Sequence, residues 1–267
     1  MNVNTSDTEK VHDQFLAYTA EKMDDPEAVE RFESLKERCE AQFDADEKAS
    51  LRVLDIGCGM GVQARVWARS GHEVTAVDLD DGLLQAGRKR ASTDGVEIDW
   101  VQASADRVPL SDGQFDICLA IELLEHVPGW EACLDELGRC LRPGGYLVVT
   151  TTNSICPSQR EFRLPLYSWW PGFLKKRMVR LAQTTKPELA NFTAWPAVNW
   201  FNYWSLRREF KKRGMEGLDR FDLMDLSRKS WPIRMLVRTA RVFPPVRAAL
   251  YLFLPGTLMY GRRAPDG

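Results

Sequence analysis

A glycine-rich segment followed by an acid is the clearest chemical signal in the sequence. Glycines stand at positions 57, 59 and 61, and Asp78 follows 17 residues after the last of them. Glycine lets the backbone turn sharply and approach a ligand without a Cβ atom in the way. The free N–H groups of a helix that starts there face the same ligand, and an acid after the next strand is placed to accept both hydroxyls of a ribose. The spacing predicts a ligand that contains a nucleoside.

A second group of reactive side chains stands at Glu122, Glu125 and His126. Positions i, i+3 and i+4 share one face of a helix, so a helix that starts near Glu122 would bring the three together. Two carboxylates and an imidazole can bind a divalent metal, or His126 can accept a proton from an attacking hydroxyl. The alternative is that this segment only shapes the start of a helix.

The elements that must position these residues lie between positions 51 and 152. Short β-type runs cover 51–56, 73–78, 96–101, 115–121 and 146–152, and helical patterns cover 62–70, 82–91 and 130–141. Continuous apolar strands separated by helices indicate a parallel sheet that is covered on both faces. The predicted fold class is α/β, with a Rossmann-like, doubly wound and mostly parallel sheet. In such a sheet ligands bind at the carboxyl ends of the strands.

The chain divides into three parts around this core. Residues 1–50 form an N-terminal helical segment, in which two acidic helices over 7–43 are broken at Asp25-Pro26 and Asp24 or Asp25 caps the second. Residues 51–152 are the ligand-binding core. Residues 153–267 hold a basic, aromatic cover with insertions, a helix at 205–213 and the closing strands of the same domain. Within this part, residues 231–255 are an insertion before the last strand at 258–262.

The order of motifs in the core resembles a known enzyme family. In the dinucleotide register the third glycine position is occupied by Val62, which does not fit that pattern. The pattern D-x-G-x-G-x-G, led by Asp55, instead resembles motif I of class I S-adenosylmethionine-dependent methyltransferases. Segments 103–116, 121–127 and 141–148 resemble the later motifs of that family, in the right order. The resemblance covers about residues 50–152.

This resemblance implies S-adenosylmethionine as cofactor and assigns its contacts. Asp55 holds the amino end, the glycines line the methionine tail, and Asp78 takes the ribose. Many members carry an aspartate for the adenine where this chain has Ser104, so that contact falls to the backbone of Ala105. The residue before Glu122 covers the adenine. The full implied set is Asp55, Gly57, Gly59, Gly61, Asp78, Leu79, Ser104, Ala105 and Ile121.

The segment E-x-x-E-H at 122–126 is similar to one in the ubiquinone-biosynthesis O-methyltransferases. The resemblance implies catalytic roles for His126 and Glu122, and a divalent metal held by Glu122, Glu125 and His126. The implied reaction is methyl transfer to a hydroxyl of a small apolar acceptor, such as a prenylated phenol or quinol or another lipid-like molecule. A soluble natural product, a sugar or an amine, an RNA, and a non-catalytic scaffold that keeps the cofactor fold are the alternatives.

Charge is distributed unevenly along the chain, although the formal net charge is only −2. Residues 1–152 carry 15 Lys/Arg and 30 Asp/Glu, whereas residues 153–267 carry 21 and 8. Tryptophans stand beside basic residues in 166–180 and 231–254, a composition typical of segments at a membrane interface. We expect these two segments to meet an anionic membrane surface. An ordinary core with a solvated basic face is the alternative, and the pI of about 6.0 disfavours nucleic acid as the partner.

Three further observations concern the compartment. No run approaches the roughly 18 apolar residues of a membrane-spanning helix. The first ten residues lack the basic and apolar regions of a signal peptide. The six cysteines show no C-x-x-C spacing, which predicts reduced thiols and neither a disulfide framework nor a zinc site. The sequence predicts a cytoplasmic protein that lies on the inner face of a membrane without crossing it.

Overall fold

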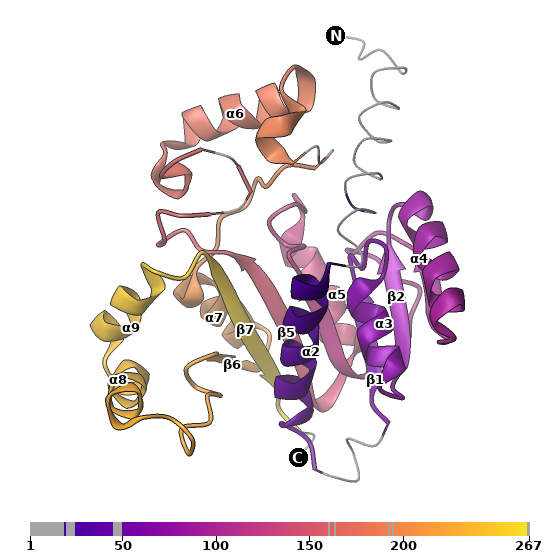
Figure 1. Cartoon of the computed structure of the whole chain (residues 1–267), viewed down its shortest axis with the longest axis horizontal. Helices are drawn as coiled ribbons and strands as arrows, with labels where there is room; N and C mark the ends of the chain where they lie inside the picture. Colours follow the sequence, from indigo (N-terminus) through magenta and orange to yellow (C-terminus); the bar gives the residue numbers. More distant parts are fainter. Residues whose placement is uncertain are drawn as a thin grey trace.

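The strands of the described chain form one mostly parallel sheet. The computed structural model describes residues 19, 25–44, 50–159, 161–162, 164–191, 193 and 195–265. The sheet has the strand order β3-β2-β1-β4-β5-β7-β6 (Figure 1). Strand β7 runs in the opposite direction to the other six and pairs antiparallel with β5 and β6. The strands are β1 Arg52–Ile56, β2 Glu73–Asp78, β3 Asp99–Gln102, β4 Phe115–Ile121, β5 Leu141–Thr152, β6 Met215–Asp219 and β7 Gly256–Arg263. The predicted α/β class is confirmed.

Helices cover both faces of this sheet because successive strand residues point to opposite sides. Val53 of β1 packs with Leu35 and Trp67 on one face, whereas Leu54 packs with Leu134 on the other. The first face carries α2 (Pro26–Glu40) and α3 (Val62–Arg69), and the second carries α5 (Trp130–Cys140) and α7 (Tyr203–Lys212) (Figure 1). The sheet is therefore doubly wound.

Local sequence signals set the ends of several helices. Asp25 caps α2 by accepting a hydrogen bond from the backbone of Glu27, and Pro26 occupies the first helical position. Asp80 caps α4 (Asp81–Asp94), which ends at Gly95 in the left-handed conformation. The predicted start of the second helix at Asp25-Pro26 is confirmed, whereas the helix predicted before it lies, apart from residue 19, outside the described residues.

The C-terminal part adds two helical insertions to the sheet. Between β5 and α7 stand two 3₁₀ turns, η2 (Tyr167–Trp169) and η3 (Pro187–Ala190), on either side of α6 (Gly172–Thr184). Between β6 and β7 stand α8 (Trp231–Val242) and α9 (Pro244–Tyr251), within the range 231–255 that was predicted as an insertion. The structure differs from prediction at β5, which starts at Leu141 and pairs with Phe115 of β4 across a shift in register.

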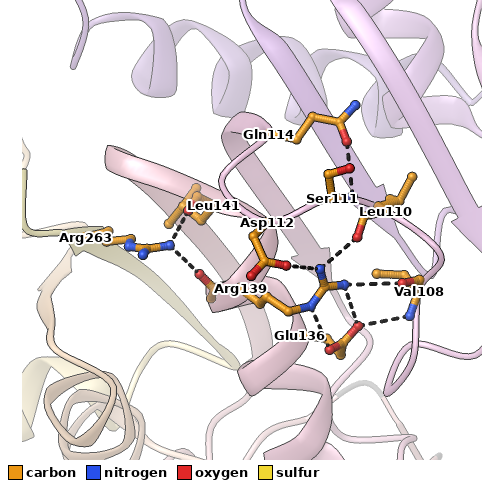
Figure 2. A network of polar contacts seen from close by, with 10 residues as sticks. Val108, Leu110, Ser111, Asp112, Gln114, Glu136, Arg139, Leu141 and Arg263 are labelled. Atoms are coloured by element: carbon orange, nitrogen blue, oxygen red, sulfur yellow. Dashed lines mark hydrogen bonds and ion pairs between the residues drawn. The ribbon is translucent and has the colours of Figure 1, made fainter. Parts of the chain in front are cut away.

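A polar network anchors the loop that joins β3 to β4 (Figure 2). Arg139 of α5 donates hydrogen bonds to the carbonyl oxygens of Leu110 at 2.7 Å and Val108 at 3.2 Å. It also pairs with Asp112 at 2.6 Å and with Glu136 at 2.9 Å, and the hydrogen bond from Arg139 holds the pKa of Glu136 below its usual value. Glu136 in turn accepts the N–H of Val108 at 3.0 Å. The loop is thus tied to a buried helix.

Replacing Arg139 with alanine should therefore destabilise the fold. The change leaves two carbonyl oxygens and two carboxylates without their charged donor, so we expect the free energy of unfolding to fall by about 2–3 kcal/mol. Urea unfolding followed by circular dichroism measures it. The exposed Arg208 of α7 provides the matched control, because Arg208→Ala should change stability by less than about 0.5 kcal/mol. Equal effects from both variants would show that the network adds nothing.

Two predictions about the compartment can be compared with the described structure. Among the described residues, no helix is long and apolar enough to cross a membrane. All six cysteines are free thiols in the structure.

Candidate functional site

The residues predicted to bind a ligand meet at one edge of the sheet. Ile56 at the end of β1 is in register with Val77 of β2 on one side and with Ala120 of β4 on the other. The segments that leave these three strands therefore start side by side. The backbone N–H groups of Gly57 and Cys58 both donate to the carbonyl oxygen of Val77, which fastens the glycine segment to β2.

The glycine segment adopts a backbone that other residues rarely reach. Gly57, Gly59 and Gly61 all have positive φ angles, of 72°, 55° and 73°. A Cβ atom on Gly61 would lie 2.3 Å from the ring of Trp100, so this glycine is required for packing. A Cβ atom on Gly59 would meet no other atom within 4 Å. The backbone at Gly59 thus borders open space, as a ligand-binding turn requires.

Two carboxylates lie beside this turn. Asp78 accepts hydrogen bonds from the backbone N–H of Gly59 at 2.8 Å and of Asp80 at 3.0 Å. Asp55 is 2% exposed, and its Oδ2 has no hydrogen-bond partner among the described residues. Burial, and then the neighbouring charge of Asp78, raise the pKa of Asp55 to about 7. Because a buried carboxylate oxygen normally has a partner, the site fits a ligand that brings a cationic group to Asp55.

The loop after β3 closes the other side of this edge. The N–H of Ala103 donates to the carbonyl oxygen of Asp78 at 3.0 Å, and the amide of Gln102 donates to that of Leu79 at 3.2 Å. Ser104 and Ala105 therefore follow directly beside Asp78, and the side chain of Leu79 is largely exposed there. Ile121 stands half-buried at the end of β4. The structure brings these predicted residues to one edge.

The segment after β4 is a turn, so the helix predicted to start near Glu122 is wrong. Glu122 has a φ of +53°, in the left-handed region that residues with a side chain rarely adopt. Its N–H donates to Thr150 of β5, and α5 begins only at Trp130, after Pro128. The side-chain amide of Asn199 holds the turn by donating to the carbonyl oxygens of residues 124 and 127.

The turn separates Glu122 from the two residues expected to join it. Its half-exposed carboxylate lies 3.3 Å from the guanidinium of Arg31 on α2. Glu125 points the other way, is fully buried, and accepts a hydrogen bond from the hydroxyl of Thr151 at 2.8 Å. Burial raises the pKa of Glu125 well above its usual value. The predicted three-residue face therefore does not form.

A different carboxylate completes the group. Glu161 Oε2 lies 3.5 Å from Nε2 of His126, while Nδ1 of His126 lies 2.6 Å from the carbonyl oxygen of Trp195. Ligand atoms of Glu125, His126 and Glu161 all lie within 4.8 Å of one another. Burial lowers the pKa of His126 and raises that of Glu161 to about 7. Sequence reasoning missed Glu161, whose only signal was that it is one of eight acids in a basic region.

The cover that supplies Glu161 has a small core of its own. Phe162, Tyr167 and Ala182 are buried together, with Trp170 and Trp200 packed against them. The ammonium of Lys175 lies 4.1 Å from the centre of the Trp200 ring and donates to the carbonyl oxygen of Ser168 at 2.7 Å. Trp170 and Lys175 therefore contribute to this core, whereas Trp169 and Phe173 of segment 166–180 are exposed. In Figure 1 the cover, with α6, lies beyond one end of the sheet.

Sequence comparisons find relatives of the core. Residues 54–149 match the model of a methyltransferase domain. The ubiquinone biosynthesis O-methyltransferase of Xylella fastidiosa (strain 9a5c) is 40% identical over 103 residues, which are 38% of this chain and 42% of that protein. The protein of the same name from Xanthomonas euvesicatoria pv. vesicatoria is 40% identical over 108 residues, 40% of this chain and 45% of that protein. The chain thus matches less than half the length of these relatives.

Solved structures share the fold at low identity. The PH0226 protein from Pyrococcus horikoshii OT3 aligns with a TM-score of 0.55 at 16% identity, over 90% of this chain and 93% of that one. An S-adenosylmethionine-dependent methyltransferase from Methanosarcina mazei aligns with a TM-score of 0.52 at 17% identity, over 82% of this chain and 94% of that one. The [4+2]-cyclase SpnF aligns with a TM-score of 0.55 at 20% identity, over 88% of this chain and 82% of that one. Residues 54–149 therefore match a methyltransferase domain by sequence, on a chain that resembles the S-adenosylmethionine-dependent methyltransferases of the ubiquinone-biosynthesis type.

Proposed function

We propose that this protein is an S-adenosylmethionine-dependent O-methyltransferase that acts on a hydroxyl of a small, apolar acceptor. The observation that supports it best is the buried oxygen of Asp55, which has no hydrogen-bond partner in the described part of the chain, beside the open backbone of Gly59. The fold alone is not sufficient support, because a [4+2]-cyclase shares it. Asp55 and the glycine turn are the parts that a cofactor with an ammonium group and a ribose requires.

Each part of this edge has a role in holding the cofactor. Asp55 pairs with the ammonium of the methionine end, and the turn at Gly57, Gly59 and Gly61 follows the tail. The free lone pairs of Asp78 accept the ribose hydroxyls, while its bonds to the Gly59 and Asp80 backbones fix its orientation. Leu79, the backbone at Ser104 and Ala105, and Ile121 enclose the adenine. When bound, S-adenosylmethionine supplies an electrophilic methyl group.

The remaining residues prepare the acceptor. The lowered pKa of His126 keeps the imidazole neutral at pH 7. A hydrogen bond from Nδ1 to the Trp195 carbonyl puts the ring proton on Nδ1, so that Nε2, which faces Glu161 at 3.5 Å, is the nitrogen that can accept a proton. A hydroxyl that loses its proton to Nε2 becomes the nucleophile. Since methyl transfer needs little beyond alignment and deprotonation of the acceptor, one positioned base is enough.

A divalent metal is the second way in which the same residues could act. Glu125, His126 and Glu161 offer two carboxylates and one imidazole, a donor set that suits Mg²⁺ or Zn²⁺. Glu122, which the sequence assigned to the metal and to catalysis, lies toward Arg31 instead. We therefore propose that Glu161, and not Glu122, is the third ligand of any metal bound with Glu125 and His126. Glu122 instead helps to position α2 through its pair with Arg31.

The lipid-soluble nature of the acceptor is supported by the names of the relatives and by the aromatic cover. Those relatives are ubiquinone biosynthesis enzymes, although they match only the core of this chain. The cover places Phe162, Tyr167 and the Trp170 and Trp200 rings beside the Glu161 segment. We propose a cytoplasmic enzyme that meets its acceptor at the inner face of a membrane.

Tritiated methyl transfer tests the reaction. The protein is incubated with labelled S-adenosylmethionine and, separately, with a cell lipid extract, a soluble metabolite pool and total RNA. We expect the label in the lipid extract. Label only in the soluble pool would move the acceptor to a natural product, sugar or amine, and label only in RNA would overturn the small-molecule proposal. No label in any pool would favour a scaffold that keeps the cofactor fold.

The raised pKa of Asp55 predicts that cofactor affinity depends on pH. Below about pH 7 the free protein holds Asp55 protonated, whereas pairing with an ammonium group favours the carboxylate. Binding therefore releases a proton at low pH, and the affinity for S-adenosylhomocysteine should rise about 5–10-fold between about pH 6 and 7.5 and then level off. Calorimetry across this range measures it. The Asp55→Asn variant should bind more weakly and show a flat profile, and a flat profile in the wild type would contradict the pairing.

A further inference from the structure

The insertion between β6 and β7 carries large apolar side chains that the described chain leaves in solvent. Trp231 is 67% exposed, Val242 81% and Phe253 82%. Met235, Phe243 and Leu252 are also exposed. We call these six residues the α8–α9 surface. A group of this size is more than the scattered single apolar residues that ordinary protein surfaces show.

The pattern along α8 makes a continuous stripe. Trp231, Met235 and Val242 are separated by four and seven residues, which places them on one face of the helix, and Arg238 falls between them on the same face. Val237 and Ala240 are buried and hold α8 to the core. The helix thus buries one side against the protein and presents the other, which is apolar and basic, to solvent.

This insertion is firmly attached, so its exposure is a fixed feature of the fold. The guanidinium of Arg247 in α9 is buried and pairs with Asp222 at 2.6 Å and with Asp219 at 3.4 Å. The hydroxyl of Tyr251 donates to Asp219 at 2.9 Å, and Arg241 of α8 donates to the carbonyl oxygen of Phe221 at 2.8 Å. These contacts anchor both helices to the segment that follows β6.

Charge indicates what covers the surface. Residues 226–265 contain eight Lys/Arg and no Asp or Glu. A second copy of the chain would bring the same cations against each other, and a nucleic acid would give Val242 and Phe253 no apolar environment. Aromatic and aliphatic side chains beside cations match the interface of a bilayer with anionic headgroups, where apolar groups enter the acyl boundary and arginines remain at the phosphates.

We propose that the α8–α9 surface docks this protein on an anionic lipid bilayer. The inference deepens the proposed function, because it rests on a lipid-soluble acceptor for its purpose and names the element that brings the enzyme to it. It also moves the main docking role away from the 166–180 segment, in which Trp170 and Lys175 serve the core of the cover. The exposed Phe173 of α6 is the matching test residue of that segment.

Liposome flotation with the full chain tests the proposal. Vesicles of phosphatidylglycerol and phosphatidylcholine are compared with vesicles of phosphatidylcholine alone, and we expect the wild type to float with the anionic vesicles at low salt. Arg234→Glu/Arg238→Glu should lower the partition coefficient by about 30-fold or more, and Trp231→Ser/Phe253→Ser by about tenfold or more. The control Arg208→Glu/Lys211→Glu makes the same charge change on exposed residues of α7 and should retain most of the binding.

Each other outcome overturns the assignment. A wild type that stays at the bottom of the gradient removes the docking surface. Loss with Phe173→Ser but not with the α8–α9 variants moves docking to α6. Equal loss with the control pair reduces the effect to net charge. Retardation of RNA in a gel, with no flotation, would make nucleic acid the partner.

The same variants keep this proposal separate from the proposed function. The altered residues lie outside the cofactor edge and none of them is buried, so binding of S-adenosylhomocysteine by calorimetry and the thermal unfolding midpoint should match the wild type. Flotation without methyl transfer to any pool would retain the docking surface and reject the enzyme. Methyl transfer without flotation would do the reverse.

Discussion

Replacing His126 with alanine is expected to lower turnover about 10²–10⁴-fold, because a positioned base contributes that much to a rate. The affinity for S-adenosylhomocysteine should change little, since His126 lies in the turn after β4 and contacts the cover through Glu161 and Trp195. Steady-state kinetics and calorimetry on the same preparation measure the two quantities. Unchanged turnover in His126→Ala would return residues 122–127 to a structural role.

Chelation separates the two ways in which His126 can act. If a metal is held by Glu125, His126 and Glu161, then EDTA should abolish activity, Mg²⁺ or Zn²⁺ should restore it, and Glu161→Gln should weaken metal binding measured directly by calorimetry. If His126 acts as a base, EDTA should have no effect. Turnover should then fall as the pH drops through the pKa of the imidazole, which burial places below its usual value, because the protonated ring cannot accept a proton.

The matched control for Glu161 is Glu122, the carboxylate that the sequence grouped with His126 and that the structure places beside Arg31 instead. Glu122→Gln removes the pair with Arg31 but leaves the group around His126 intact. We expect Glu161→Gln to lower turnover more than Glu122→Gln does. The opposite order would support the assignment made from the sequence, in which Glu122 is a catalytic residue.

The parts of this site that the sequence predicted are those that depend on local patterns. The glycine turn and Asp78 lie at the ends of apolar strands, and parallel pairing brings strand ends to one edge whatever the rest of the chain does. The first and last residues of β2 and β4 were predicted without error for the same reason, because buried strands are continuous apolar runs.

The parts that could not be predicted depend on contacts between distant segments. The helix expected at Glu122 fails because Thr150 and Asn199, 28 and 77 residues further on, hold the backbone as a turn. Glu161 lies in an irregular segment without period, so nothing in the sequence connects it to His126. Lys175 reads as a surface cation in its basic stretch, yet a tryptophan 25 residues later covers it. Composition indicates what such a region contains but not which residues it buries.

The second large effect is expected at Asp78. Its alanine variant should bind S-adenosylhomocysteine about 30–150-fold more weakly, which corresponds to about 2–3 kcal/mol for two hydrogen bonds to a ribose. The structure adds a further reason, because the carboxylate also accepts the N–H groups of Gly59 and Asp80 and so fixes the turn that borders the open space. Calorimetry on the wild type and the variant measures the difference.

Two controls show which of these contributions is lost. Asp81→Ala removes a nearby carboxylate at the first position of α4, where it interacts at the surface with Gln85 and Arg88, and it should leave the affinity unchanged. Asp78→Asn keeps one oxygen that can accept a hydrogen bond, so its affinity should fall between those of the wild type and Asp78→Ala. An Asp78→Ala variant that binds as tightly as the wild type would place the ribose elsewhere. Binding of NADH in place of S-adenosylhomocysteine would instead make this edge of the sheet a dinucleotide site. Both cofactors present a ribose to Asp78 at the end of β2, so this outcome is possible despite Val62 in the third glycine position.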